Sequence, residues 1–433
     1  MIRSYIKDVQ VDEICKISGW IEIIREQKTM MFLVVTATTG SIQVAIEKDK
    51  IAELATDDFD KISRHSVVTI WGKVVSAPCV KLGQIELVPS GIEIESLAED
   101  LPIDDQTAGE LKMDFRWIDL RQQKQRLIFQ IRTFAEAKMR EYFVDRGYIE
   151  IHTPKITSQC SEGGAEVFTL DYYGQKAYLT QSPQFYKQMA IASGFDKVFE
   201  IGPYYRAEKS FTARHTAEAV CLDFEIAHVK SHHDVIDVEE DWMLYVMRKI
   251  KETYGTQIKE IFDVEVKVPT KIPRLKLKEV FQIFRDVYGI ETPEEKQLDL
   301  DPEAEKLICE YTRDYLDSEF VFITDYPAEA RAFYSKKITD DSFDCMGFDM
   351  LYRGWEMNSG AVREHRYAQL KQQIEEHGID SSKMADYLEF FKYGCPTHGG
   401  IGFGIDRFIS KLLDLQSLKD SIFLFRGPSR LNP

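Results

Sequence analysis

Five short runs of β-branched and alternating residues near the N-terminus constrain the fold of this chain more than any other feature. They cover residues 14–24, 30–36, 41–47, 67–75 and 84–88, and turn-forming residues separate them. Five such strands, with a polar helical segment over Ile51–Ile62 between the third and the fourth, are typical of the five-stranded barrel that binds oligonucleotides. A barrel with a purely structural role is the alternative.

The remaining residues predict a second, larger domain. A chain of 433 residues is too long for one ordinary core. The acidic stretch after the barrel, with Leu101-Pro102, indicates a hinge over residues 96–125. We therefore expect a barrel domain over residues 1–95 and a second domain over residues 126–433. Within the latter, the mostly helical and acidic residues 231–320 are interpreted as an insertion without obvious chemistry.

Local patterns of the second domain predict a helix, a strand and a hairpin. Residues 126–147 have helical periodicity, with Gly147 as a stop signal. A strand, Tyr148–Ile151, follows and is closed by Pro154. The strand-like residues 197–208 and 219–229 flank a polar loop, which favours an antiparallel hairpin.

Composition limits the compartment and the partners. The chain has no secretory signal and no membrane-length apolar run, and its seven cysteines are scattered singly. We therefore expect a cytoplasmic protein with buried, reduced thiols and no membrane partner. A formal charge of −17 argues against broad, non-specific binding of nucleic acid, although a local RNA site stays open.

The predicted hairpin carries the first polar cluster. Side chains two apart on a strand point the same way, which pairs Arg206 with Glu208 and Asp223 with Glu225. The connecting loop adds Arg214-His215. A solvated charged surface is the simpler alternative to a functional site.

Two further clusters follow toward the C-terminus. A turn at Arg353-Gly354 would fold Asp349 back toward Glu356, and two carboxylates so placed could hold Mg²⁺. An ordinary acidic hairpin is the alternative. The last cluster is a glycine-rich run, Gly399–Arg407, that enters an amphipathic helix. Too few residues follow it for a dinucleotide-binding unit, so Arg407 is better interpreted as a cation for a nucleotide phosphate.

Taken in order, these segments resemble the three signature motifs of class II aminoacyl-tRNA synthetases. The similar segments are Tyr148–Pro154, Tyr205–His215 and Gly402–Arg407. Further segments resemble the aspartyl branch, of the compact archaeal and eukaryotic type: Ser161–Phe168, Gln181–Lys187, Asp325-Tyr326-Pro327 and Phe333-Tyr334. The resemblance implies an α+β fold, with an N-terminal OB-fold anticodon-binding barrel and a catalytic antiparallel sheet flanked by helices.

The resemblance also implies roles for residues of an ATP site. Arg206 would hold the α-phosphate of ATP, Glu208 would receive the adenine amino group, and Arg407 would bind the γ-phosphate with help from Arg214 and His215. Mg²⁺ would be held by Asp349 and Glu356, with Ser359 nearby. Chemistry of this kind needs position and charge stabilisation and no protein nucleophile.

A second group of implied residues would bind the amino acid and the tRNA. Lys187 and Arg363 would bind the aspartate side chain, while Glu162, Gln184 and Asp223 would bind the amino group and form the surrounding network. Ser359 is a further implied aspartate-binding residue. Asparagine would be rejected because it leaves buried charge unpaired. In the barrel, Phe32, Gln43 and Glu86 match positions that bind anticodon bases; a buried core position for Phe32 is the alternative.

The resemblance thus implies a homodimeric ligase that activates L-aspartate with ATP and charges tRNA(Asp), and it leaves open whether tRNA(Asn) is charged as well. The alternatives are an asparaginyl enzyme, an asparagine-forming paralogue, and a catalytically silent RNA-binding paralogue. Two departures from the family pattern concern the ATP site. Ala219 stands where many eukaryotic members have an aromatic residue, and the C-terminal segment Phe425–Leu431 is altered.

Overall fold

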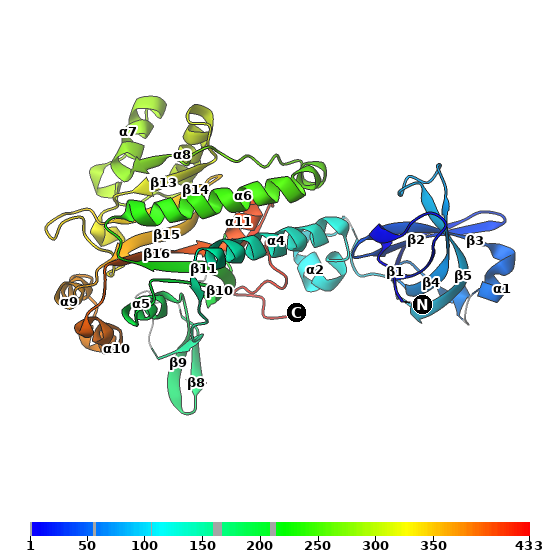
Figure 1. Ribbon diagram of the computed structural model, residues 1–433, viewed down its shortest axis with the longest axis horizontal. Coiled ribbons are helices and arrows are strands. Elements are labelled where there is room, and N and C mark those ends of the chain that lie inside the picture. Colours follow the sequence, from blue (N-terminus) through cyan, green and yellow to red (C-terminus); the bar gives the residue numbers. More distant parts are fainter. Residues whose placement is uncertain (1, 55–57, 105, 159–166, 208–213) are drawn as a thin grey trace. The chain divides into compact units, whose positions relative to one another are not determined.

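The chain forms two compact units, Met1–Arg126 and Leu127–Pro433. The computed structural model describes residues 2–54, 58–104, 106–158, 167–207 and 214–433. Within these residues no helix is long and apolar enough to cross a membrane. Figure 1 shows the elements of both units along the chain.

The first unit contains a closed barrel, as the sequence predicted. Its strands are β1 (Ile14–Glu26), β2 (Met30–Ala37), β3 (Gly40–Glu47), β4 (Val67–Ser76) and β5 (Ile85–Ser96), in the order β1-β2-β3-β5-β4. Alternate side chains fill the interior, among them Ile17, Leu33, Val35, Ile42, Val44, Ile70 and Leu87. Because strand side chains alternate between faces, the residues between these point outward.

Short helices complete the first unit. The segment expected to be helical between β3 and β4 contains α1 (Ile51–Leu54) and a 3-10 turn, Phe59–Lys61. After the barrel, the residues expected to form a hinge contain α2 (Gly109–Asp114) and α3 (Arg116–Asp119). Arg116 and Asp119 form a buried ion pair. These residues therefore contain two short helices, with a buried ion pair inside α3, and the hinge stays a prediction.

The second unit is built on an eight-stranded sheet with the order β12-β13-β14-β15-β16-β11-β10-β6. Its strands are β6 (Ile149–Glu150), β10 (Lys197–Tyr205), β11 (Glu218–Ala227), β12 (Arg274–Lys276), β13 (Phe320–Thr324), β14 (Gly347–Tyr352), β15 (Trp355–Arg363) and β16 (His398–Gly404). The sheet is antiparallel as expected, except that the two end strands, β6 and β12, pair in parallel. A separate sheet contains β7 (Ile156–Thr157), β8 (Thr169–Tyr172) and β9 (Gln175–Leu179).

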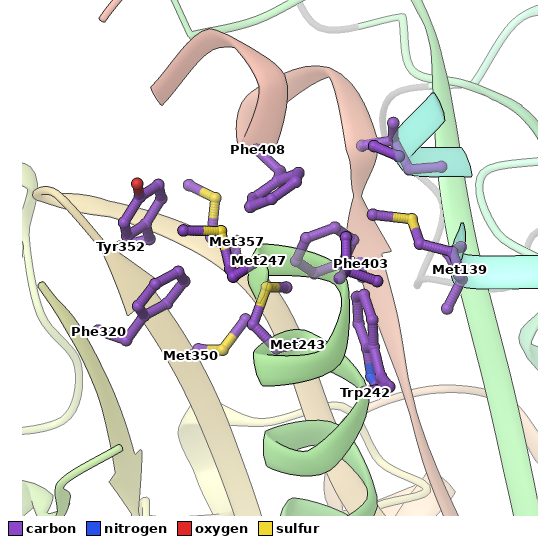
Figure 2. Packing of buried hydrophobic residues seen from close by; sticks show 14 of the residues in the cluster. Met139, Trp242, Met243, Met247, Phe320, Met350, Tyr352, Met357, Phe403 and Phe408 are labelled. Carbon is purple, nitrogen blue, oxygen red and sulfur yellow. The ribbon is translucent and has the colours of Figure 1, made fainter. Parts of the chain in front are cut away.

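One face of this sheet is apolar and packs against three helices, α4 (Gln123–Asp145), α6 (His232–Phe262) and α11 (Ile405–Leu412). Figure 2 shows the interior of this core, where Trp242 meets Phe403 edge-on and Phe320 stacks on Tyr352. Since α6 supplies much of the core, residues 232–262 are integral to the domain. The interpretation of residues 231–320 as an insertion stays a prediction, and the structure adds that the apolar side of α6 is part of the core.

The opposite face of the sheet is partly covered by other helices of the second unit. At the β13 end, α7 (Leu277–Tyr288) and α8 (Pro302–Tyr315) pack on Val321, Ile323 and Leu351. A further apolar cluster is formed by α9 (Tyr367–Glu376) and α10 (Ala385–Glu389), beside α5 (Gln184–Ala192). The polar residues of the sheet lie between these covers.

The cysteines within the described residues are free thiols, as the sequence predicted. Four of them are buried, but Cys79 is exposed and Cys395 is half-buried. The expectation that all are buried was wrong for these two, because a scattered cysteine carries no sequence signal of its burial.

Candidate active site

A row of residues crosses five neighbouring strands and brings the three polar clusters together. In the strand register, each of the following lies opposite the next: Glu200, Asp223, Gly402, Ser359 and Asp349. Residues directly opposite each other point to the same face of a sheet. The apolar face carries Leu222, Phe224 and Phe403. The hairpins β10–β11 and β14–β15 and the glycine-rich strand β16 therefore share one polar surface.

The glycines of β16 allow this surface to form. A Cβ atom at Gly400 would lie 2.0 Å from the carbonyl oxygen of Phe224 and 2.3 Å from Oε2 of Glu225. A Cβ atom at Gly402 would lie 3.1 Å from Oδ1 of Asp223. The glycine-rich run is thus a strand that leaves room for the carboxylates of β11, and it leads directly into α11 as the sequence predicted.

Two buried cations meet on the carboxylates of β11. Nζ of Lys187 on α5 lies 2.8 Å from Oδ1 of Asp223 and 3.6 Å from Oε2 of Glu225, and donates to the Ile401 carbonyl at 2.8 Å. Arg363 at the end of β15 donates to Glu225 from Nε at 3.0 Å and to the Gly400 carbonyl at 2.9 Å. Burial opposes ionisation of Glu225, but Arg363 and Lys187 lower its pKa overall. The four side chains form a balanced, water-poor charge cluster.

A hydrogen-bond chain sets the orientation of Gln184 in the first turn of α5. Its Nε2 donates to Oε1 of Gln188 at 3.0 Å, and the hydroxyl of Tyr387 donates to the same oxygen. Nε2 of Gln188 faces Nε2 of His398 at 2.9 Å, and Nδ1 of His398 faces the Pro396 carbonyl at 2.8 Å.

The protonation of His398 completes this chain. Burial lowers its pKa to about 4, so the ring is neutral. A neutral ring that donates from Nδ1 to a carbonyl must accept at Nε2 from Gln188. The amide group of Gln184 is thereby oriented with its nitrogen toward Gln188.

The β14–β15 hairpin holds a second charged cluster. Arg331 pairs with Asp349, donates to Oγ of Ser359 at 3.1 Å, and its guanidinium carbon lies 3.5 Å from the ring centroid of Tyr326. Oδ1 of Asp349 is buried and has no hydrogen-bond partner among the described residues. Burial and the nearby Asp349 raise the pKa of Glu356, while Arg407, Arg331 and Arg206 oppose that rise. Asp349 and Glu356 therefore lie within electrostatic reach of each other, and Glu356 also lies within reach of Arg206 and Arg407, the predicted phosphate-binding arginines.

A cavity beside this cluster gathers the candidate nucleotide-binding residues. It is lined by Arg206, Arg214, His215, Ala219 and Arg407, among others. Arg407 donates to the Glu356 carbonyl at 3.0 Å. The start of α11, and so Arg407, is fixed by Asp406, which is buried, accepts from the backbone N–H of Val220 at 2.8 Å and pairs with Arg132 of α4.

The altered C-terminal segment lies beside this cavity. The Arg426 carbonyl accepts from the backbone N–H of Ala217 at 2.9 Å and from the hydroxyl of Thr216 at 3.0 Å. The segment therefore supports the residues that lead into β11, and its departure from the family pattern does not separate it from the site.

In the barrel, the three candidate anticodon residues lie on the outward face of neighbouring strands. Gln43 and Glu86 are opposite each other in β3 and β5, and Nε2 of Gln43 donates to Glu86 at 3.1 Å. Phe32 of β2 is half-buried and lies between Met31 and Leu33, which contact the barrel interior. The alternative interpretation, in which Phe32 is a buried core residue, is therefore wrong.

Two of the candidate residues predicted from the sequence are not among the residues that the structure describes, and some residues of these clusters were given no role by the sequence. Glu162 and Glu208 are outside the described residues. The unassigned residues are Glu225, Arg331 and Glu305, which Arg214 contacts. Alternation along β11 was a signal for Glu225, since it shares a face with Asp223. No local pattern distinguishes Arg331 or Glu305 from ordinary surface charges.

The sequence matches two family descriptions. Residues 108–426 match "tRNA synthetases class II (D, K and N)", and residues 15–95 match "OB-fold nucleic acid binding domain". The chain is 37% identical to an aspartate–tRNA(Asp) ligase of Pyrococcus abyssi, over 100% of both chains. It is 34% identical to an aspartate–tRNA(Asp/Asn) ligase of Aeropyrum pernix, over 96% of this chain and 95% of that one.

Solved structures with similar folds include both amino-acid specificities. Asparaginyl-tRNA synthetase of Pyrococcus horikoshii, complexed with asparaginyl-adenylate, has a TM-score of 0.92 and 27% identity, with 100% of both chains covered. Aspartyl tRNA synthetase of Entamoeba histolytica has a TM-score of 0.85 and 27% identity, covering 98% of this chain and 90% of that one. The fold by itself therefore does not distinguish aspartate from asparagine.

Proposed function

We propose that this chain, which belongs to the class II tRNA synthetases of the D, K and N group, is an aspartate–tRNA ligase. It activates L-aspartate with ATP to aspartyl-adenylate and transfers the aspartyl group to the 3′ end of tRNA(Asp). Full-length similarity to aspartate–tRNA ligases supports the activity. The observation that carries the choice of aspartate is the buried cluster of Lys187 and Arg363 on Asp223 and Glu225.

The charges of this cluster suit the three charged groups of aspartate. The cluster is neutral before substrate binds, with two cations and two carboxylates. When the substrate ammonium pairs with Asp223, one positive charge of Lys187 or Arg363 becomes available to the side-chain carboxylate. Asparagine brings the ammonium but no side-chain charge, and so leaves a buried cation without a partner. Such a mismatch costs on the order of a few kcal/mol, which is enough for discrimination.

The amino-group side of the pocket takes further residues. Gln184, whose amide nitrogen is directed to Gln188, presents its carbonyl oxygen as an acceptor for the substrate ammonium. Ser359 lies in the same row of the sheet as Asp223, across Gly402. Glu162 belongs to the same proposed network, on the resemblance of its segment to the aspartyl branch.

The nucleotide occupies the cavity of Arg206 and Arg407. The substrate α-carboxylate attacks the α-phosphorus in line, the bond to the β-phosphate breaks, and pyrophosphate leaves. Arg206 holds the α-phosphate, while Arg407, Arg214 and His215 receive the charge of the pyrophosphate end. Glu208 receives the adenine amino group. Such groups act by positioning and by stabilising charge, so no protein nucleophile is needed.

The residues of the β14–β15 hairpin fit a magnesium ion. Among the described residues no three His, Cys, Asp or Glu side chains gather to hold a metal. Mg²⁺, however, needs only one or two protein carboxylates and completes its shell with water and phosphate oxygens. In the part of the chain that the structure describes, Oδ1 of Asp349 is buried and has no hydrogen-bond partner, and Glu356 lies within electrostatic reach of it. These two residues, with Ser359 nearby, would hold the ion, which would neutralise phosphate charge.

The barrel residues Phe32, Gln43 and Glu86 read the anticodon in this proposal. Their shared outward face suits a single-stranded loop, in which a base stacks on an aromatic ring and hydrogen-bonds beside it. The Aeropyrum pernix relative is an aspartate–tRNA(Asp/Asn) ligase, which favours tRNA(Asn) as a second candidate substrate.

The family resemblance extends the proposal to a cytoplasmic homodimer. β6 is the last strand of the sheet order, and its outer edge pairs with no strand among the described residues. Ile149 of that strand is 47% exposed, and an exposed apolar edge strand can pair with a second copy of the chain. Light scattering of the purified chain should give twice the monomer mass; a monomer would contradict this part.

ATP–pyrophosphate exchange tests the proposed activity. We expect exchange that depends on aspartate, and at least about a hundredfold lower kcat/KM with asparagine, which is the discrimination that roughly 3 kcal/mol provides. Preference for asparagine would refute the role of the cation cluster. Absence of exchange with either amino acid would refute the ligase and favour a silent RNA-binding protein.

A further inference from the structure

An acidic side chain from α8 contacts one of the arginines that line the nucleotide cavity. Oε2 of Glu305 lies 3.0 Å from Nη1 of Arg214, and its side chain is 12% exposed. Arg214 lines the cavity together with Arg206 and Arg407. Glu305 belongs to residues 231–320, in which the sequence showed no chemistry, so α8 supplies a residue to the site from an unexpected element.

Arg214 has further contacts that fix its guanidinium group. Nη2 of Arg214 donates to the Gly354 carbonyl at 3.3 Å, and the guanidinium carbon lies 5.3 Å from the ring centroid of Trp355. Nζ of Lys411 lies 4.3 Å from the centroid of the same ring. Glu305, the β14–β15 turn and an aromatic ring thus hold Arg214 through three kinds of contact.

The carboxylate that holds Arg214 is itself on a fixed support. Asp301 caps α8 by accepting from the backbone N–H groups of Glu303 and Ala304, at 3.0 and 2.8 Å. Ile308, one turn beyond Glu305, is fully buried in the apolar cluster between α8 and the sheet. A rigid support matters because an arginine side chain loses rotamer freedom when it is fixed.

The charges around Glu305 show why its pairing with Arg214 matters. Burial and the nearby Glu356 raise its pKa to about 7, against the opposing effects of Arg214 and Arg407. Without its arginine, this carboxyl would be an isolated acid beside the predicted phosphate site. When it is paired with Arg214, the same carboxylate is stabilised by the arginine and holds the guanidinium group in place.

We propose that Glu305 is a positioning residue that holds Arg214 at the nucleotide cavity before ATP binds. The inference rests on the proposed function, since it takes the phosphates of ATP as the partner of Arg214. Glu305 itself touches no substrate. It acts by ordering the guanidinium in advance, so that ATP binding need not restrict a freely moving side chain.

The test is a set of variants with ATP affinity and exchange kinetics as readouts. Glu305→Ala should raise the KM for ATP about tenfold, the effect of losing one charge-assisted hydrogen bond, and leave the KM for aspartate within about twofold. Glu305→Gln, which keeps an acceptor for Arg214, should recover part of the loss. Glu310→Ala, on the same helix and half-exposed, is the matched control and should behave as the unaltered chain.

A double variant separates positioning from general damage to the fold. In an Arg214→Ala background, Glu305→Ala should not raise the KM for ATP, because the residue through which it acts is absent and the acid left without a partner is removed. An equal loss in both backgrounds, an unchanged KM for ATP in Glu305→Ala, or a lowered one would overturn the inference. Calorimetric binding of a non-hydrolysable ATP analogue gives the same comparison without catalysis. Failure of the unaltered chain to exchange pyrophosphate would instead refute the proposed function.

Discussion

Lys187→Met is the substitution that most directly removes the charge proposed to select aspartate. Methionine is similar in length and unbranched, so the volume at this 2% exposed position is largely kept. The variant loses the 2.8 Å contacts of Nζ with Asp223 and with the Ile401 carbonyl. Asp223 retains the Sγ of Cys221, 2.9 Å from its Oδ2, as a weak hydrogen-bond partner.

The size of the effect follows from what the substrate loses. A hydrogen bond to a charged group contributes about 1.5–3 kcal/mol, so the kcat/KM for aspartate should fall roughly 10- to 150-fold. The kcat/KM for asparagine should not fall, because its amide needs no cation and the cation that it leaves unpaired is removed, and the preference for aspartate should shrink by at least the same factor. The folded state should also be less stable, by up to about 3–5 kcal/mol, since one member of a buried ion pair is left alone.

ATP–pyrophosphate exchange with saturating ATP and varied aspartate measures the effect, and a thermal melt shows whether the variant is folded. Lys392→Met, the same change at a side chain 42% exposed and paired with Glu389, is the control and should keep full activity. A loss of less than about fivefold for aspartate in a folded variant would contradict the role of Lys187, as would an equal loss for asparagine.

Three further substitutions probe the supports of the site. Gly400→Ala should abolish soluble folded protein or cost more than about 4 kcal/mol in a chemical denaturation curve, because its Cβ would lie 2.0 Å from a backbone oxygen; Gly109→Ala, where no atom lies within 4 Å, should be tolerated. Burial lowers the pKa of His398 from 6.5 to about 4, so the neutral ring stabilises the fold fully above pH 6.5, and this contribution is lost as the pH falls toward 4. The free energy of unfolding of His398→Gln should therefore depend less on pH over that range, by up to about 3 kcal/mol. An unchanged pH dependence would contradict a neutral buried ring. Asp406→Ala should raise the KM for ATP, because Arg407 loses the tie of α11 to Val220 and to α4, and an unaltered KM in a folded variant would show that Arg407 needs no such support.

Structural features that depend on the pattern of neighbouring residues were predictable from the sequence. The five barrel strands and the β10–β11 hairpin follow alternation between faces, which is a property of neighbouring residues. The three ordered motifs predicted the family as well, and the matches over residues 15–95 and 108–426 confirm it. The register that aligns Asp223, Ser359 and Asp349 then follows from strand pairing.

Features that depend on distant packing were not predictable. The helix α6 has a buried side only because the sheet lies against it, and the sequence does not show which surface will cover it. Arg331 and Glu305 resemble many other charged residues until Asp349 and Arg214 are placed beside them. The sequence placed Glu225 on the same face as Asp223. Its role as the shared partner of Lys187 and Arg363, however, requires β11, α5 and β15 to come together in the fold.

Aminoacylation of a tRNA transcript with a GUC anticodon tests the central claim most directly. The unaltered chain should esterify labelled aspartate to this transcript and should leave asparagine unattached under the same conditions. A GUU transcript in parallel reports whether tRNA(Asn) is a second substrate. Formation of asparaginyl-tRNA, or no aspartyl-tRNA on the GUC transcript, would contradict the assignment.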